Sequence, residues 1–503
     1  MPKSRKSKTA LKSSSKKKKI AARARKTVVK SQAEKVRIRT YRHGLGDCHL
    51  LSFKKSDGSP FNILIDCGVV NRTQNPIPLM TGVADNVKEE TKGVLDVVVA
   101  THQHTDHLSG FKQADPIFRP MEMRRLWLAW TEDPNNPLGS RIKRQLVRTL
   151  AAVREAALKL TAIGADTANR IQSVLQFFGP AAAGDNTQAI LNDLQGRSGL
   201  EIAYYKPGDT FLLPEVPNVR VYVLGPPEDP VALKITNPRA SKKEGYEAAE
   251  LASSATGLAA ALLGPDTEQD PELSYPFERI RRKDASGMKL DAYFKTHYYD
   301  SDPETGESQD WRQIETAWLE SAEELALALN SFTNNTSLAL AFEFVDSGEV
   351  LLFPGDAQIG SWLTWKELGW IVPDSKGQTR KVDIADLFSR TVFYKGSHHA
   401  SHNGTLSGLA EGETGLEQMT HRDLVCVVPV DRAMSKIMKW DRTLPWAPLL
   451  KRLSEKTRGR LLLTDVTEKP PDPQALTTLS AAEREHFSKQ VVVEQKWIEY
   501  TLW

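Results

Sequence analysis

The sequence predicts an α/β protein in which two β-sheets pack together with helices outside them. Three observations lead to this class: strand-like runs in the first part of the chain, helical periodicity in the middle, and strand-like runs again in the last part. The length of 503 residues exceeds that of one small domain and allows a sizeable buried core. We therefore expect one large core with an insertion, or two domains.

Four strand-like runs open the body of the chain. The first three are residues 35–42, 48–53 and 61–68, with Gly44, Gly46 and the stretch "SDGSP" as turns between them. The fourth run, residues 95–101, is continuously apolar, which indicates a strand buried on both faces. It leads directly into a cluster of histidines.

The middle of the chain is predicted to be a largely helical insertion, at about residues 130–330. From Ser140 onward apolar residues recur every three or four positions, and Trp311, Ile314, Trp318, Leu325 and Leu329 mark a second amphipathic helix. A strand is expected at residues 218–230. Residues 231–303 lack a steady period and are expected to be a surface insertion or a partly ordered loop.

Strand character dominates the last third of the chain. A hairpin is expected at residues 337–344 and 350–356, where "DSGE" forms the turn. Further strand-like runs are residues 390–405, 424–430, 460–466 and the C-terminal "VVVEQKWIEYTLW". No internal repeat of fixed period is present.

The net charge of +4 conceals a basic N-terminal tail. Residues 1–35 contain 14 Lys and Arg and one acidic residue, which leaves 53 basic and 62 acidic residues, a charge of about −9, for residues 36–503. Such a tail cannot bury enough apolar surface to order itself and should be disordered when free. It is predicted to contact nucleic-acid phosphates; a solubilising tail or a nuclear-localisation signal are the alternatives.

Cysteine content and hydropathy exclude several classes of protein. Cys48, Cys67 and Cys426 form no C-x-x-C pair, which argues against a disulfide framework and a thiolate zinc site. No run of about 18 apolar residues is present, and the N-terminus lacks the apolar core of a signal peptide. We expect a soluble cytoplasmic protein with no membrane partner.

The stretch "VVVATHQHTDHLSGF" carries the strongest chemical signal. His102, His104, Asp106 and His107 follow the pattern H-x-H-x-D-H after the buried strand. In an extended chain, residues two apart point the same way, so His102 and His104 can hold one cation together. If the chain then turns into a helix, Asp106 and His107 can face a second position. These ligand types suit zinc, and also manganese or iron.

At this point the chain resembles the metallo-β-lactamase superfamily, whose signature includes H-x-H-x-D-H after a buried strand. Asp66 in "LIDCG", Asp356 in "LLFPGD" and a late histidine in "YKGSHHASHNGT" occur in the family's order. The resemblance covers residues 36–405. It implies an αββα four-layer sandwich with the metal site at one edge of the two sheets, and a single hydrolase domain over residues 36–503.

Three further stretches resemble one subfamily. "HGLGDCHLL", "NNTSLALAFE" and "GSHHAS" are similar to motifs of the hydrolase domain of ComEC-type DNA-uptake proteins and of stand-alone ComEC-like hydrolases. The membrane-channel region of ComEC is missing. The resemblance therefore implies a phosphodiesterase or nuclease that hydrolyses DNA or RNA with a metal-activated water, without a DNA-uptake pore. It also suggests a role in a multi-component bacterial antiphage system with protein partners.

The resemblance assigns roles to individual residues. His102 and His104 would hold the first metal, Asp106, His107 and a late histidine the second, and Asp356 would bridge them, with one or two ions of Zn²⁺ or Mn²⁺ per chain. His399 is the preferred late histidine, and His398 is the alternative. Asp66 is expected to orient the site through hydrogen bonds.

One departure from the family pattern affects the first metal. Many members have a histidine where this chain reads "TNNTSL", and Asn334 or Asn335 is a poor substitute for imidazole. The first metal is therefore expected to be weakly held. His297 is expected to be a surface residue, because nothing around it has ligand spacing.

Other polar and aromatic residues near the motifs have two interpretations. Lys395, Ser401 and His402 are candidates to contact phosphate or protonate the leaving oxygen, or they are bystanders. Asp47 either positions the site or only forms a turn. Three tryptophans could stack on bases but are expected to serve packing: Trp127, Trp130 and Trp497.

Two other functions remain open from the sequence. A metal-dependent hydrolase of a small ester, lactone, thioester or nucleotide would use the same residues, because fold and metals alone do not select a substrate. A non-catalytic subunit of a larger assembly would keep the fold and use the tail or the insertion for docking.

Overall fold

The chain is an α/β protein built on two large sheets. The computed structural model describes residues 34–162, 166–179, 186–239, 287, 291–301, 305–306, 317–465 and 470–503. Residues 1–33 of the predicted basic tail, most of the predicted loop at 231–303, and Trp311 and Ile314 of the predicted second helix lie outside the described residues. Lys35 is described and forms an ion pair with Glu349.

The first sheet contains eight strands in the order β18-β19-β1-β2-β3-β5-β7-β8. Its strands are β1 (Val36–Tyr41), β2 (Cys48–Lys54), β3 (Pro60–Cys67), β5 (Val97–Val99), β7 (Arg125–Ala129), β8 (Glu201–Tyr205), β18 (Val491–Val493) and β19 (Trp497–Leu502). The strands β18 to β3 pair antiparallel, and β3, β5, β7 and β8 pair in parallel. Because parallel neighbours require crossovers, helices cover this half of the sheet.

The second sheet contains seven strands in the order β17-β16-β15-β12-β11-β10-β9. Its strands are β9 (Thr210–Leu213), β10 (Val216–Gly225), β11 (Ala339–Phe344), β12 (Val350–Phe353), β15 (Thr391–Lys395), β16 (Val425–Val428) and β17 (Leu461–Leu463). The expected hairpin at 337–356 is β11 and β12, paired antiparallel with Leu340 opposite Phe353. Two small pairs lie apart from the large sheets: β4 (Val94–Leu95) with β6 (Glu122–Met123), and β13 (Gly369–Pro373) with β14 (Thr379–Asp383).

The central core lies between the two large sheets. One cluster of buried side chains combines strand residues of both sheets, such as Phe53 of β2, which packs against Phe342 of β11 with ring centroids 5.8 Å apart. Two further cores lie on the other faces of the sheets. Burial of both faces explains why β5, which is three valines, is continuously apolar rather than alternating.

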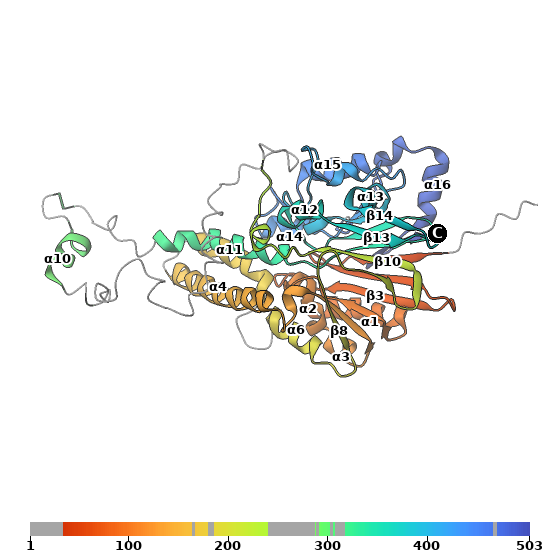
Figure 1. Ribbon diagram of the computed structural model, residues 1–503. Helices are drawn as coiled ribbons and strands as arrows, with labels where there is room; N and C mark the ends of the chain where they lie inside the picture. Colours follow the sequence, from red (N-terminus) through yellow and green to blue (C-terminus); the bar gives the residue numbers. More distant parts are fainter. Residues whose placement is uncertain are drawn as a thin grey trace, which may run out of the picture.

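Helices cover the outer face of each sheet. Figure 1 shows α1, α2, α3 and α6 beside the first sheet, and α12, α13 and α15 beside the second. Their bounds are α1 (Pro76–Thr91), α2 (Thr105–Gln113), α3 (Asp115–Phe118), α6 (Thr187–Gln195), α12 (Ile359–Trp365), α13 (Ile384–Ser389) and α15 (Ala447–Lys456). Further α-helices of the described residues are α7 (Pro230–Leu233), α10 (Ala292–Phe294), α14 (Arg432–Ile437) and α16 (Ala481–Gln490).

Three helices from the predicted insertion gather at one end of the sheets. They are α4 (Pro137–Ala162), α5 (Asp166–Leu175) and α11 (Ala317–Asn335), and α4 and α11 lie side by side at the left of Figure 1. Their apolar faces share a core with Leu45, Val70 and Met434, so they are part of the body. The stretch expected as an insertion also contains β8, β9 and β10, which complete the two large sheets.

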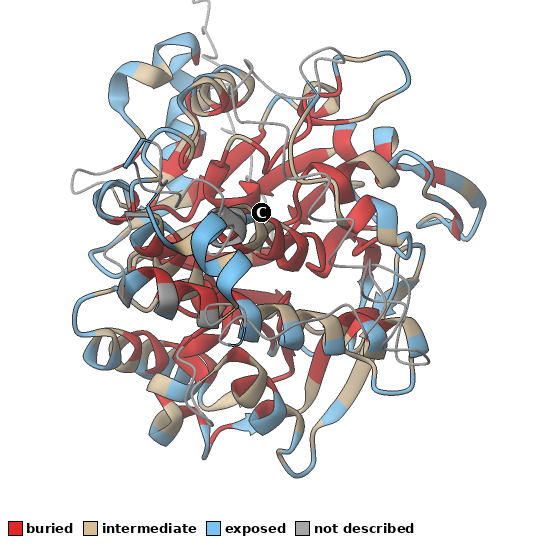
Figure 2. Cartoon of the chain, turned by 90° about the vertical axis from the view of Figure 1, so that its left-hand side faces the viewer, coloured by how far each residue is buried: buried red, intermediate tan, exposed pale blue. Residues whose placement is uncertain are grey.

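Burial follows this layered arrangement. Figure 2 shows that buried residues fill the strands and the helix faces turned toward them, while exposed residues lie on outward helix faces and in loops. Trp127 is 1% exposed and packs against Tyr205 and Phe211, so it is unable to stack on a base. Among the described residues, no helix combines the length and the apolar character needed to cross a membrane.

Candidate metal centre

The H-x-H-x-D-H residues lie where β5 ends and α2 begins. His102 and His104 belong to the loop after β5, and His104 is the N-cap of α2 with an extended backbone. Asp106 and His107 stand in the first turn of the helix, where the positive end of the helix dipole favours a carboxylate. The expected change from strand to helix within the motif therefore takes place at Thr105.

Glycines allow the start of α2 to approach two other segments of the chain. A Cβ on Gly68 would lie 2.3 Å from the carbonyl oxygen of Thr105, and one on Gly46 would lie 2.2 Å from that of Gly68. The backbone N–H of Asp47 donates to the carbonyl of Asp106 over 2.8 Å. The "GLGD" loop thus places Asp47 in contact with the start of α2. Any larger side chain at Gly46 or Gly68 would push this loop, the end of β3 and the start of α2 apart.

The late histidines occupy a turn of unusual backbone conformation. His398, His399 and Ala400 have φ angles of 45°, 51° and 57°, a left-handed region that costs non-glycine residues energy. The turn follows β15 and brings His399 back toward the other sheet. Nδ1 of His399 donates to the carbonyl of Pro429 over 2.8 Å, which leaves Nε2 directed at the centre.

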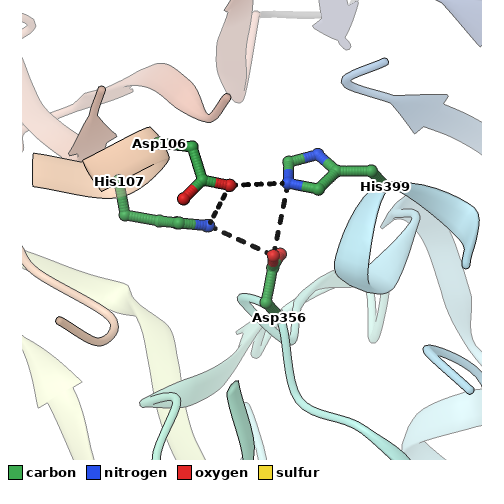
Figure 3. A group of neighbouring side chains, drawn as sticks. All are labelled: Asp106, His107, Asp356 and His399. Carbon is green, nitrogen blue, oxygen red and sulfur yellow. Dashed lines mark hydrogen bonds and ion pairs between the residues drawn. The ribbon is translucent and has the colours of Figure 1, made fainter. Parts of the chain in front are cut away.

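Four side chains from the two halves of the chain meet at one point (Figure 3). Asp106, His107, Asp356 and His399 each offer one ligand atom within 4.8 Å of the others. Nε2 of His399 lies 3.1 Å from Asp106 and 3.3 Å from Asp356, and Nε2 of His107 lies 3.2 Å from Asp356. All four are at most 1% exposed. This group could hold a metal ion.

The donor set and the unsatisfied atoms both fit a cation. Two imidazole nitrogens and two carboxylate oxygens are common ligands of divalent transition metals and zinc. Oδ1 of Asp106 and Nε2 of His104 are buried without a hydrogen-bond partner. Because buried polar atoms are normally satisfied, both atoms are available to a cation bound at this place.

Asp66 orients His107 through a hydrogen bond from Nδ1, the ring nitrogen that does not face the group of four. Its carboxylate accepts hydrogen bonds from the backbone N–H and hydroxyl of Thr101, at 2.8 and 2.7 Å, and from Nδ1 of His107 at 2.7 Å. With Nδ1 engaged, His107 presents Nε2 to the group of four. Asp47, Asp66 and His107 form a second acidic cluster, but the carboxylate of Asp66 is fully used in holding His107 and Thr101.

Lys395 is buried and tied to two carboxylates. Its ammonium lies 2.6 Å from Asp47 and 2.8 Å from Asp356, and it donates to the carbonyl of Gly355 over 2.8 Å. Burial opposes the charge, yet the two carboxylates raise the pKa of Lys395 well above its ordinary value. All three N–H donors have protein partners, so Lys395 holds Asp356 in place rather than facing a substrate.

His102 and His104 lie beside the group of four without joining it. Nε2 of His102 is 3.0 Å from Nδ1 of His104, and the His102 ring is 4.1 Å from that of His107. Burial lowers the pKa of His104 to about 3 and that of His102 well below its ordinary range, so both rings are neutral and able to ligate.

His398 and the asparagines of the "TNNTSL" stretch form a separate polar cluster. Nδ2 of Asn334 donates to Nε2 of His398 over 3.1 Å, and Ser401 lies 2.6 Å from Nδ1 of the same ring. Both His398 nitrogens are thus engaged, and the structure places His399 rather than His398 in the group of four. Asn335 accepts from the backbone N–H groups of Gln358 and Ser361 and stabilises the start of α12.

The remaining candidates lie farther from the centre. Nε2 of His402 is 3.1 Å from Asn237, and burial lowers the pKa of His402 to about 4. His297 is exposed. Trp130 donates to the carbonyl of Pro226, and Arg39 lies over the Trp497 ring, so both tryptophans have packing roles.

Sequence reasoning missed the side chains that cover His104. The rings of Phe177 and Phe178, from the 3-10 turn Gln176–Phe178 after α5, lie 5.3 and 5.0 Å from the His104 ring. No motif marks them, since they are two apolar residues in a long helical stretch. No protein-family model, curated protein or solved structure matches the chain, so the function is inferred from these contacts.

Metal affinity should fall as pH falls. Burial alone would lower the pKa values of His107 and His399, but neighbouring carboxylates raise the first well above 6.5 and the second to about 10. Both rings are therefore protonated near neutral pH without metal, and a cation must displace these protons. We expect log K to rise with pH by about one to two per unit between roughly pH 6 and 8. Calorimetry of metal-depleted protein in buffers of different ionisation enthalpy would measure this; an affinity independent of pH would contradict the assignment.

Replacing Lys395 by methionine should destabilise the fold. The change leaves the buried carboxylates of Asp47 and Asp356 facing each other without a cation, and breaking a buried ion pair costs about 3–5 kcal/mol. Urea unfolding in the presence of a chelator measures the loss independently of bound metal. The exposed Lys376→Met change is the matched control, with an expected effect within about 0.5 kcal/mol. Equal free energies of unfolding for the two variants would contradict the conclusion that the ion pairs of Lys395 stabilise the fold.

Proposed function

We propose that the chain is a metal-dependent phosphodiesterase of the metallo-β-lactamase superfamily, similar to stand-alone ComEC-like hydrolases. The observation that carries the proposal is the convergence of Asp106, His107, Asp356 and His399 from both sheets on one buried point. The two stacked sheets with outer helices are compatible with an αββα sandwich. The resemblance in motif order supplies the reaction class, and Zn²⁺ or Mn²⁺, one or two ions per chain, is the proposed cofactor.

The chain's own residues hold and orient the reacting groups. A divalent ion, when bound, lowers the pKa of water and polarises a phosphoryl oxygen. Asp106, His107, Asp356 and His399 would hold it, and Asp66 and Lys395 keep two of these ligands in position. Oδ1 of Asp106 has no protein hydrogen-bond partner, so this carboxylate is available to the ion. In hydrolysis the water oxygen bonds to phosphorus, the bond to the leaving oxygen breaks, and a proton passes to that oxygen.

Nucleic acid is the proposed substrate. The basic tail supports this proposal because it places 13 Lys and Arg and no acidic residue in residues 1–33. Participation in an antiphage system with protein partners remains a prediction from the resemblance alone.

Removing ligands of the centre should abolish hydrolysis. His399→Ala and Asp356→Asn are expected to lower the rate on a small phosphodiester such as bis(p-nitrophenyl) phosphate by more than about 100-fold, since loss of an outer partner alone costs 10–100-fold. Elemental analysis of the same samples should show loss of metal. The assay is run with each divalent cation in turn, which also identifies the metal.

The control is His486→Ala, because His486 is exposed on α16. It should retain both the metal content and the rate. Full turnover by a His399→Ala protein that contains no metal would overturn the proposed function.

Deleting residues 1–33 tests the nucleic-acid substrate. If the tail binds phosphates, its loss should weaken oligonucleotide binding and flatten the dependence of log K on log salt, while the rate on the small phosphodiester stays the same. The effect should be large because the rest of the chain is acidic and repels a polyanion. Unchanged binding at physiological salt would leave the tail as a solubilising or targeting segment.

A further inference from the structure

A cavity of about 790 Å³ lies between the helices of the middle region and the turn that carries the late histidines. Its walls come from α5, α11, the end of α14 and the segment after it, and the loop at Thr236 and Asn237. His402 and Asn403, three and four residues after His399, also line it. We call it the middle-region cavity. Sites for small molecules have volumes of about 300–1,000 Å³, so one nucleotide or two would fit.

The cavity is adjacent to the candidate metal centre on two sides. Asn403 lies 3.3 Å from Nδ1 of His398, which at 7% is more exposed than any ligand of the group of four. On the other side, the cavity residue Trp440 stacks on Phe177 with ring centroids 4.9 Å apart, and Phe177 lies 5.3 Å from His104. A ligand in the cavity would therefore lie one layer of side chains from the centre.

The charge of the cavity favours an anion, because its lining contains four Lys and Arg residues against two carboxylates, Glu323 and Glu324. Arg72, Lys439 and Arg442 line it and are exposed, and none of them has a carboxylate within ion-pair distance in the described part of the chain. The fourth cation of the wall, Arg170, pairs with Glu323 at 2.6 Å. These unpaired cations stand on a body whose charge is about −9, so they create a local attraction where the rest of the surface repels anions.

The other wall residues favour a ligand with a flat ring and polar edges. Ile437 and Leu327 are 60% and 45% exposed, and with Trp440 they offer apolar surface. Asn169 and Asn237 provide amide groups. Cations beside apolar and aromatic surface are the combination that binds single-stranded nucleic acid, whose bases are unstacked and accessible. A duplex hides its base faces and is too wide for a cavity of this size.

We propose that the middle-region cavity binds one or two nucleotides of a single-stranded substrate, next to the phosphodiester that the metal centre cleaves. The position relative to cleavage depends on the proposed function, whereas binding in the cavity does not. Lys439 and Arg442 would contact phosphate, and Ile437, Leu327 and Trp440 would contact a base. The cavity would thus select single-stranded over duplex substrates.

The test is oligonucleotide binding by the full chain with two charge-reversed residues. Lys439→Glu with Arg442→Glu should weaken binding of a labelled short single strand by at least about tenfold at physiological salt. The control, Lys381→Glu with Lys451→Glu, makes the same change in net charge at exposed positions outside the cavity lining and should change the affinity less than about twofold. Equal loss in both variants would overturn the proposal.

Competition experiments test the ligand class independently of catalysis. A 5′-mononucleotide should displace the labelled strand far better than inorganic phosphate or an equal concentration of duplex. Equal competition by inorganic phosphate would reduce the cavity to a simple anion site. Because the tail would also bind duplex, selection of single strands would be refuted if the Lys439→Glu, Arg442→Glu variant lost as much affinity for duplex as for the single strand.

Activity measurements separate the two proposals. If both hold, the cavity variant should show a raised KM for the oligonucleotide and an unchanged rate on bis(p-nitrophenyl) phosphate. If the intact chain hydrolyses neither substrate with any divalent cation, the proposed function fails. The oligonucleotide-binding measurements then still test whether the middle-region cavity binds single strands.

Discussion

Four buried aspartates at the junction of the two sheets determine which charged groups must lie beside them. Asp47, Asp66, Asp106 and Asp356 are at most 1% exposed, and Lys395 is the one buried Lys or Arg with an ion pair to any of them in the described chain. Isolated charges in such a place are very unfavourable, so the remaining negative charge must be offset by protons on His107 and His399 or by a divalent cation. The residues of the site therefore favour either protonated His107 and His399 or a bound divalent cation, and binding of a cation would release the protons.

Local sequence patterns determine much of this arrangement, and these parts could be predicted. Strand-like runs bounded by turn residues predicted β1, β2 and β3, and a continuous apolar run predicted β5, each to within a few residues. The density of ligands in H-x-H-x-D-H marked His107 and Asp106, since both lie in one helical turn.

Other features depend on contacts between distant segments and have no local signal. Lys395 looked like a phosphate-binding residue, but its environment is set by Asp47, almost 350 residues earlier in the chain. A left-handed turn decides which of His398 and His399 points to the group of four. The stretch "GSHHAS" does not predict this turn, because the positions with positive φ are His398, His399 and Ala400 and none of them is glycine. The helices α1 and α15 were not predicted either; each packs on the outer face of a sheet, and this packing depends on strands distant in the sequence.

The turn with the late histidines and the middle helices are different parts of the structure, so the proposed hydrolysis and the proposed substrate binding depend on different residues. Hydrogen bonds near the strand ends orient two of the candidate ligands: His399 donates to the carbonyl of Pro429, and His107 to the carboxylate of Asp66. The cover over His104 and the cavity beside it come from α5, α11 and the end of α14, which share a core of their own. Substitutions on the cavity side of these helices are expected to leave the arrangement of the candidate ligands intact, because that arrangement depends on strand ends and on α2. If both proposals hold, changes in the middle region alter the substrate that is bound while the candidate metal centre stays the same.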